Sequence, residues 1–310
     1  MRKTVCEKDM CTGCAACLDI CPKDALIFED SVSSMNVFVD SNRCIGCNAC
    51  LNVCQVNEPA KLSPPFFWKQ GWAKNDVRRK SSSGGFATQL MMSFIDEDSY
   101  VCSCVFKAGH FSYYVTNNAA EIDLYKGSKY VKSNPKGIYK EVNMLLNQGK
   151  RCLFVGLPCH IAAMKKYLHG RYEEQLYTVD LICHGAPSPE IIKKFLTEHK
   201  YDIHSLKDIR FRVKNTFDVL PGAESIVPIG TLDRYTIGFL RGLFYTENCY
   251  SCNYAKLDRI SDITIGDSWG TELLEEEKKG ISIALCQTDK GKKLLLKSNL
   301  KLFDVDIDKA

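Results

Sequence analysis

The N-terminal segment carries eight cysteines in two runs of the same spacing. The first run is C-x2-C-x2-C-x3-C-P, and the second repeats it with glutamine in place of the proline. Two intervening residues let a tight loop turn three thiolates toward one face of a cubane cluster, and Gly13 and Gly46 relieve crowding near the sulfurs. The pattern predicts two 4Fe-4S clusters.

The fourth cysteine of each run is expected to bind the other cluster, as in bacterial two-cluster ferredoxins. Structural zinc and unrelated buried thiols are the alternatives, but zinc sites use separated CxxC pairs. Cys6 lies outside the pattern, and we interpret it as a spare thiol. The two expected ligand sets are Cys11, Cys14, Cys17 and Cys54 for one cluster, and Cys44, Cys47, Cys50 and Cys21 for the other.

Composition narrows the class of protein. The chain has 310 residues and 17 cysteines, and its start, MRKTVCEKDMC, contains no apolar signal segment. A metal-binding, oxygen-sensitive protein of a reducing compartment is favoured over a disulfide scaffold, so we expect a cytoplasmic protein. No apolar run is long enough to span a membrane. The formal charge of +4 is offset by clusters of about -2 each, so nucleic-acid binding is not expected.

The chain divides into two expected domains. The proline-rich stretch 57–67 follows the cysteine repeat, so we expect a ferredoxin-like α+β domain at 1–60 and an α/β domain with a mixed sheet at 61–310. Cysteines 102, 104, 152 and 286 fall within strand-like segments and are expected in the core. The pattern predicts helices at 83–96, 138–148, 160–168 and 188–200, a hairpin at 100–107 and 111–116, and strands at 151–156, 176–183, 209–213, 262–265 and 281–287.

Five further motifs occur in order behind the repeat. They are GSKYVKS at 127–133, FVGLPCH at 154–160, VDLICHGAPSP at 179–189, CYSCNYA at 249–255 and SDITIGDSWG at 261–270. In this order the chain resembles the family of coenzyme F420 hydrogenase and dehydrogenase beta subunits, from about Cys11 to Gly270. Three positions depart from the usual pattern: Lys132 and His160 replace glutamine, and Ser268 replaces an aromatic residue. The chain also stops sooner than many relatives. The substrate pocket is the feature of the family for which this difference matters most.

The resemblance implies a flavin, FAD in the best-known members, which exchanges electrons between iron-sulfur clusters and a two-electron carrier such as F420. By position, Ser82, Ser83, Gly84 and Gly85 would cradle the flavin pyrophosphate, although Ser83 is also interpreted as a helix cap. Lys129, Tyr130 and Ser133 would approach the ring or ribityl chain. Asp267 would bind a ribityl hydroxyl or cap a turn. His184 would donate a proton or hydrogen bond near the flavin, with a structural role as the alternative.

Four cysteines of the second domain suggest a third 4Fe-4S cluster. Two of them follow apolar strands, where α/β folds place their sites, and two form a CxxC in a loop. Zinc on the CxxC and buried free thiols remain the alternatives. The four residues are Cys159, Cys183, Cys249 and Cys252.

Three functions fit the sequence. The first is an FAD-dependent oxidoreductase that moves electrons between the clusters and a small-molecule hydride carrier, F420 or a similar one. The second is a non-catalytic subunit that relays electrons to a partner enzyme. Either would use a redox partner protein or ferredoxin, and a domain that has lost its flavin is the third alternative.

Overall fold

The computed structural model describes residues 3–222, 224–228 and 231–309. Its N-terminal part holds one antiparallel pair, β1 (Leu26–Asp30) with β2 (Met35–Val39), and two short helices, α1 (Ala16–Ile20) and α2 (Ala49–Asn52). Each helix starts after a residue with positive φ, 59° at Ala15 and 58° at Asn48. The repeated conformation matches the repeated cysteine spacing, because both runs fold as a loop that leads into one helical turn.

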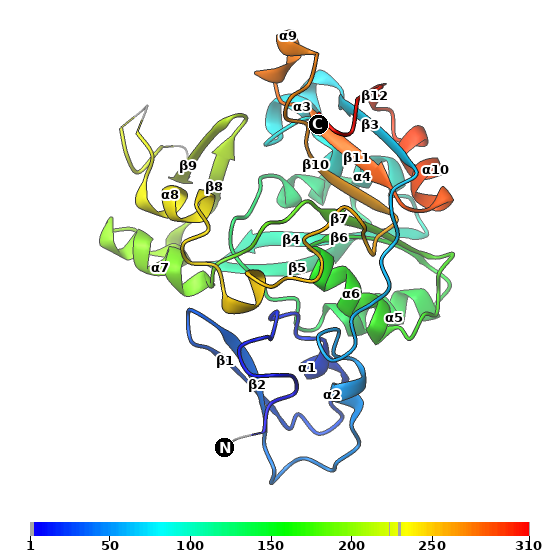
Figure 1. The fold of residues 1–310 in the computed structure, drawn as a ribbon, viewed down its shortest axis with the longest axis vertical. Helices are drawn as coiled ribbons and strands as arrows, with labels where there is room; N and C mark the ends of the chain where they lie inside the picture. The colour runs from blue at the N-terminus through cyan, green and yellow to red at the C-terminus, as the bar shows by residue number, and fades with distance from the viewer. Residues whose placement is uncertain (1–2, 223, 229–230, 310) are drawn as a thin grey trace.

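The rest of the chain is built on one mixed sheet of eight strands, in the order β12-β3-β11-β10-β7-β6-β4-β5 (Figure 1). The four central strands β10, β7, β6 and β4 are parallel, and antiparallel strands flank them on both sides. The strands are β3 (Phe67–Trp72), β4 (Ser99–Lys107), β5 (His110–Thr116), β6 (Arg151–Gly156), β7 (Leu176–Leu181), β10 (Ile263–Asp267), β11 (Ser282–Cys286) and β12 (Lys301–Phe303).

Helices cover both faces of the sheet. Successive side chains along a strand point to opposite faces, so each face forms its own core with the helices that cover it. On β6, Cys152 and Phe154 join the core that contains α5 (Ile138–Asn147) and α6 (Pro158–Tyr167). Leu153 and Val155 join the opposite core, under α4 (Phe86–Phe94) and α10 (Asp289–Lys297). The first of these cores continues into the N-terminal part, where it includes Cys14, Cys17 and Val53.

A third core lies beside the sheet and is rich in aromatic residues. It joins α7 (Pro189–Glu198) and α8 (Arg234–Leu240) to a separate hairpin, β8 (Ile209–Val213) with β9 (Thr216–Pro221). The remaining elements are α3 (Asn75–Lys80), α9 (Leu274–Glu277) and the 3-10 turns η1 (Ala119–Tyr125), η2 (Ile203–Ser205) and η3 (Glu247–Cys249).

The expected α/β domain with a mixed sheet is present, with several differences in detail. The helix expected at 83–96 covers only Phe86–Phe94, since Gly85, with φ of 87°, ends the preceding turn. The strand expected at 209–213 pairs outside the main sheet. β3 and β12 were not expected, because β3 directly follows a proline-rich stretch and β12 has three residues. Of the cysteines expected in the core, Cys102, Cys152 and Cys286 are fully buried and Cys104 is partly buried.

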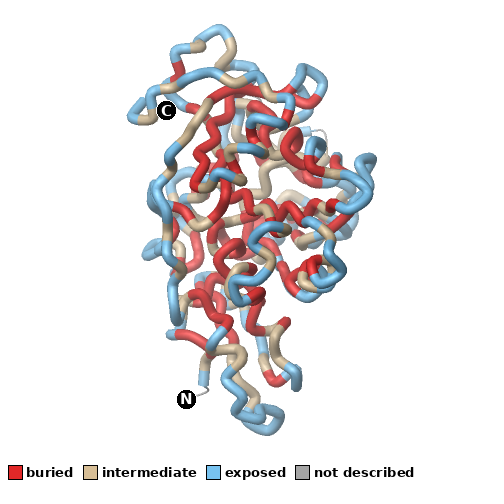
Figure 2. The backbone as a smooth tube through the Cα atoms, turned by 90° about the vertical axis from the view of Figure 1, so that its right-hand side faces the viewer, coloured by how far each residue is buried: buried red, intermediate tan, exposed pale blue. Residues whose placement is uncertain are grey.

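Polar bonds attach the N-terminal part to the α/β part. The Tyr139 hydroxyl donates to the Cys14 carbonyl at 2.7 Å, and the Gly137 amide donates to the Asp19 carboxylate at 2.8 Å. The Tyr254 hydroxyl donates to Gln55 Oε1 at 2.6 Å. Figure 2 shows that the far tip of the N-terminal part is exposed, whereas the chain facing the sheet is largely buried. Within the described residues, no helix has the length and apolarity needed to cross a membrane.

Asp180 on β7 makes stability depend on pH. The side chain is fully buried, and this burial raises its pKa from 3.8 to about 6, against the opposing charge of Arg259. Between those two values the folded protein binds more protons than the unfolded one, so the unfolding free energy falls as pH rises. We expect a loss of about 1 kcal/mol from pH 5 to pH 7 in anaerobic urea unfolding of the holoprotein.

Asp180→Asn should remove this dependence, because the amide does not titrate. Glu97→Gln is the control, since Glu97 is exposed on the surface. An equal pH slope in Asp180→Asn and in the wild type would contradict the assignment.

Candidate redox site

The first cysteine set is buried in the N-terminal part. Cys11 and Cys14 lie on the loop that leads into α1, Cys17 is the second residue of α1, and Cys54 approaches from the residues that follow α2. Burial raises the pKa of Cys14 to about 12, and the neighbouring Cys11 and Cys54 add to that effect. A buried thiol with so high a pKa gives up its proton to a bound cation and not to water, so Cys14 suits a metal cluster better than a free dithiol.

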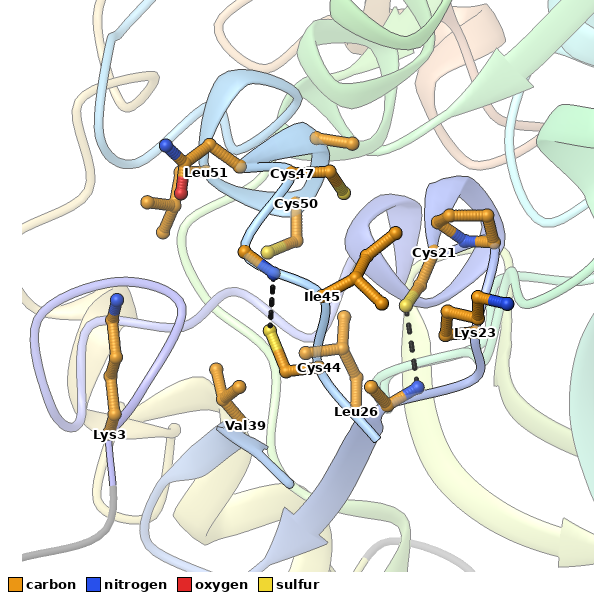
Figure 3. Close-up of a pocket in the computed structure, with 15 residues that line it drawn as sticks. Lys3, Cys21, Lys23, Leu26, Val39, Cys44, Ile45, Cys47, Cys50 and Leu51 are labelled. Carbon is orange, nitrogen blue, oxygen red and sulfur yellow. Dashed lines mark hydrogen bonds between the residues drawn. The ribbon is translucent and has the colours of Figure 1, made fainter. Parts of the chain in front are cut away.

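The second set surrounds a small cavity of about 50 Å³, lined by Cys21, Cys44, Cys47 and Cys50 (Figure 3). Backbone amides face two of the sulfurs: Gly46 donates to Cys44 Sγ and Ala25 donates to Cys21 Sγ, each at 3.4 Å. Such N–H···S contacts stabilise thiolates. Cys44 and Cys47 are exposed, so this set lies at the outer end of the molecule.

In the structure, the fourth cysteine of each run therefore lies with the other run. Cys21 lines the cavity of the second run, and the charges acting on Cys17 include those of Cys11, Cys14 and Cys54. That arrangement is the one expected from the crossed ligand sets of two-cluster ferredoxins.

Cys6 is a neighbour of the first set that the spacing pattern did not reveal. Hydrogen bonds to Cys11 and Cys54 raise the pKa of the Cys6 thiol. The same contact with Cys6 lowers the pKa of Cys54 to about 6. Cys6 is thus the protonated thiol of this group, and its single proton can be donated to one of the two sulfurs at a time. Its position follows from β2, which pairs with the N-terminal residues, and the sequence carries no local signal for it.

The four cysteines of the second domain also come together. Cys159 is the second residue of α6, directly after β6, and Cys183 lies two residues beyond β7. Because β6 and β7 are parallel, both cysteines lie at the carboxyl edge of the sheet. Cys249 and Cys252 reach this edge from η3 and the loop behind it. Burial raises the pKa of Cys159, and the charges of Cys183, Cys252 and Cys249 raise it further.

Two neutral side chains contact one sulfur of the third set. Thr246 Oγ1 lies 3.6 Å and Asn248 Nδ2 3.7 Å from Cys249 Sγ. In the parts of the chain that the structure describes, no group of three or more His, Cys, Asp or Glu side chains is arranged to hold a single metal ion. A 4Fe-4S cluster is held by one thiolate at each of its four irons, so its ligands need not converge on a single ion.

A cavity of about 350 Å³ lies between the end of α3, the segment around η1 and β8, and its lining is strongly basic. Seven basic residues against two acidic ones give it a positive potential that would attract phosphate groups. Ser82 and Lys129, two of the residues expected at a flavin, are in the lining. The basic residues are Arg79, Lys80, Lys126, Lys129, Lys207, Arg210 and Arg212, and the acidic ones are Asp123 and Asp208.

Two other residues of the serine-glycine turn are hydrogen-bonded to β11 and to Ile281, the residue directly before this strand. The Gly84 amide donates to Ser282 Oγ at 3.1 Å, and the Ser83 hydroxyl donates to the Ile281 carbonyl at 2.9 Å. A Cβ at Gly84 would lie 2.6 Å from the Gly71 carbonyl oxygen, so glycine is required there for packing. Gly85 is the N-cap of α4. Ser82 alone of these four is in the lining of the basic cavity.

Asp267 and Lys129 are engaged with neighbouring groups. Asp267 forms a two-point ion pair with the buried Arg212 guanidinium, with one contact at 3.1 Å. Lys129 Nζ donates to the carbonyls of Tyr125 at 2.9 Å and Lys126 at 2.8 Å, and burial lowers its pKa. Ser133 is buried.

Aromatic rings connect the basic cavity with the third cysteine set. The Arg212 guanidinium lies 4.8 Å from the Phe217 ring centroid, and Phe217 stacks on Tyr130 at 5.9 Å. Tyr130 stacks on Phe239 at 4.4 Å, and Phe239 lies 5.3 Å from the His184 ring. His184 directly follows Cys183, so packed rings span the whole distance.

His184 has a defined tautomer. The Tyr245 hydroxyl donates its one proton to the Phe239 carbonyl at 2.6 Å, so it must accept from His184 Nδ1, which lies 2.6 Å away. Nε2 is then the proton acceptor of the neutral ring. Partial burial lowers the pKa of His184 and favours this neutral form.

The fold and the cysteine sets define an iron-sulfur protein with an α/β domain. Residues 3–58 match the family described as 4Fe-4S dicluster domain, and residues 149–302 match the C-terminal region of the coenzyme F420 hydrogenase/dehydrogenase beta subunit. Residues 149–302 thus belong to the coenzyme F420 hydrogenase/dehydrogenase beta subunit family, and a 4Fe-4S dicluster domain precedes them at residues 3–58.

A solved structure has a similar fold. It is a chain of the F420-reducing NiFe hydrogenase complex from Methanosarcina barkeri, in a xenon-derivatised form, with 20% identity and a TM-score of 0.54 over 76% of this chain and 80% of that chain. A search of the curated proteins gave no match.

Cys252→Ala should remove one cluster. We expect the anaerobically purified variant to lose about four irons out of about twelve, because the third set would lack one of its four thiolates. Cys286→Ala is the matched control: Cys286 is a fully buried core cysteine on β11 and should leave the iron content unchanged. Equal iron in Cys252→Ala and the wild type would exclude Cys252 as a ligand.

Proposed function

We propose that this chain is a flavin-dependent iron-sulfur oxidoreductase that moves electrons between 4Fe-4S clusters and a two-electron carrier, F420 or a similar compound. One observation carries the proposal: three sets of four cysteines extend from the exposed tip of the N-terminal part to the carboxyl edge of the central strands, and packed aromatic rings continue from the third set to a basic cavity. Each end of this arrangement suits a different partner, a protein at the exposed cysteines and a phosphate-bearing molecule in the cavity.

The chain's own residues support a phosphate-bearing cofactor in the basic cavity. Ser82, Lys129 and Arg210 would hold the phosphates of FAD, and Arg212 keeps its charge in place through Asp267. When bound, the flavin would supply the exchange between hydride and single-electron chemistry. Tyr130, which directly follows Lys129, and Ser133 further along the same segment belong to this proposed site as well.

Ser83, Gly84 and Gly85 contribute to the same site by holding the turn in place. Their bonds to β11 and the N-cap position of Gly85 fix the turn from which Ser82 reaches the cavity. Their role in this proposal is to position Ser82 and not to contact the pyrophosphate.

His184 would hold or accept a proton on Nε2, because its Nδ1 proton is committed to Tyr245. The ring lies between Cys183 and the aromatic residues that lead to the cavity. It is therefore the titratable group best placed to serve a hydride-transfer step at neutral pH.

The exposed second cysteine set would face a redox protein such as a ferredoxin. Cys44 and Cys47 are exposed, and Ile45 between them is 61% exposed. Lys3 and Lys23 line the same cavity and would attract an acidic partner. The proposed domain division at residues 60 and 61 separates this electron-transfer module from the α/β domain.

The isolated chain should turn over. Anaerobically reconstituted protein supplied with reduced F420, NADH, NADPH or reduced ferredoxin should sustain electron transfer to an artificial acceptor with at least one of these donors. No turnover with any of them, in protein that holds both flavin and iron, would favour the alternative of a relay subunit that acts only within a larger assembly.

Arg210→Glu should weaken flavin binding. Replacing a positive by a negative charge in the basic cavity should lower flavin affinity at least tenfold, about 1.4 kcal/mol, in titrations of flavin-depleted protein. Arg241→Glu makes the same charge change at an exposed residue outside the cavity lining and is the control. Unchanged affinity in Arg210→Glu with intact iron content would place the flavin elsewhere.

A further inference from the structure

Lys132 is a buried cation that lies between the first and third cysteine sets. Lys132 is 6% exposed, and its backbone amide donates to the Pro187 carbonyl at 2.9 Å. The ammonium donates to the Thr12 carbonyl at 3.0 Å and to Asn248 Oδ1 at 2.8 Å. Thr12 is adjacent to Cys11, and Asn248 is adjacent to Cys249. One side chain thus touches the loops that carry both sets.

The two partners of Lys132 are neutral oxygens, and among the described residues no carboxylate pairs with this ammonium. A buried charge without a counter-ion is strongly unfavourable. Its two hydrogen-bond partners, Thr12 and Asn248, are the sequence neighbours of Cys11 and Cys249, so the ammonium lies beside the ligand loops of both sets. Anionic clusters in the two sets would supply the missing negative charge.

The surroundings of Lys132 are held by further hydrogen bonds. Asn248 Oδ1 also accepts from Thr246 Oγ1 at 2.9 Å, and Asn248 Nδ2 faces Cys249 Sγ. On the other side, Thr12 Oγ1 accepts from Gln55 Nε2 at 2.9 Å. The ammonium therefore has a fixed position between two ligand loops that lie more than a hundred residues apart in the sequence.

We propose that Lys132 is a positioning residue whose fixed charge is shared by the two inner clusters and raises the reduction potential of both. The inference rests on the proposed cluster assignment. When either cluster gains one electron, its negative charge increases, and a cation held nearby in a medium of low polarity stabilises that charge. No bond forms or breaks, and the ammonium keeps its proton.

The test is an anaerobic redox titration of the purified holoprotein, followed by electron paramagnetic resonance, with iron and sulfide counted. In Lys132→Met, the reduced-to-oxidised ratio of the two inner clusters at a fixed potential should fall at least tenfold, about 59 mV for one electron. The outer cluster of Cys21, Cys44, Cys47 and Cys50 should keep its potential. Lys132→Arg retains the charge and should keep all potentials near those of the wild type.

Lys297→Met is the control, because it removes one positive charge from an exposed position on α10. The proposal is overturned if Lys132→Met holds all clusters at unchanged potentials, or if Lys132→Arg shifts them as Lys132→Met does. Loss of iron from both Lys132 variants would likewise overturn it, since the role would then be steric. Loss of iron from Lys132→Met alone, with normal potentials in Lys132→Arg, supports a need for the charge. A wild-type protein without the third cluster would contradict the cluster assignment instead.

Discussion

The hydrogen-bonded junction between the N-terminal part and the α/β part is the constraint on which the rest depends. Electrons cross between redox centres only over short distances, so the two cysteine-rich regions must be held against each other. The bond from Tyr139 to the Cys14 carbonyl, the bond from Gly137 to Asp19 and the bonds of Lys132 provide that attachment. All of them engage groups next to, or close to, the first cysteine set, so the ligand loop and the junction are ordered together.

The three cysteine sets also differ in how far they are buried. The second set is exposed at the tip, the first set is buried in the core shared with α5 and α6, and the third lies at the carboxyl edge of the central strands. Since the charge of a cluster costs more in a less polar medium, the inner sites need compensation that the outer one receives from water. The buried cation of Lys132, the Cys6 thiol and the Asn248 amide would supply it from the protein.

The sequence predicted those features whose signal is local. The two cysteine runs carry their own geometry, and Cys159 and Cys183 follow strands that could be recognised from apolar residues alone. The basic cavity could not be predicted, because its charges come from α3, η1 and β8, which meet only through tertiary packing. The turn at Ser83 and Gly84 has the composition of a phosphate cradle, yet its polar groups bond to β11 and its flank. This contact with β11 forms only in the folded sheet and could not be predicted from the sequence. The contact of Cys6 with Cys11 and Cys54 also depends on the folded structure.

The most direct test of the account is the stoichiometry of the anaerobically purified wild-type chain, with iron, acid-labile sulfide and extracted flavin measured on one sample. Three clusters and a flavin domain predict about twelve irons, about twelve sulfides and one flavin per chain. About eight irons without FAD or FMN would contradict the account, because the α/β domain would then hold neither the third cluster nor the flavin.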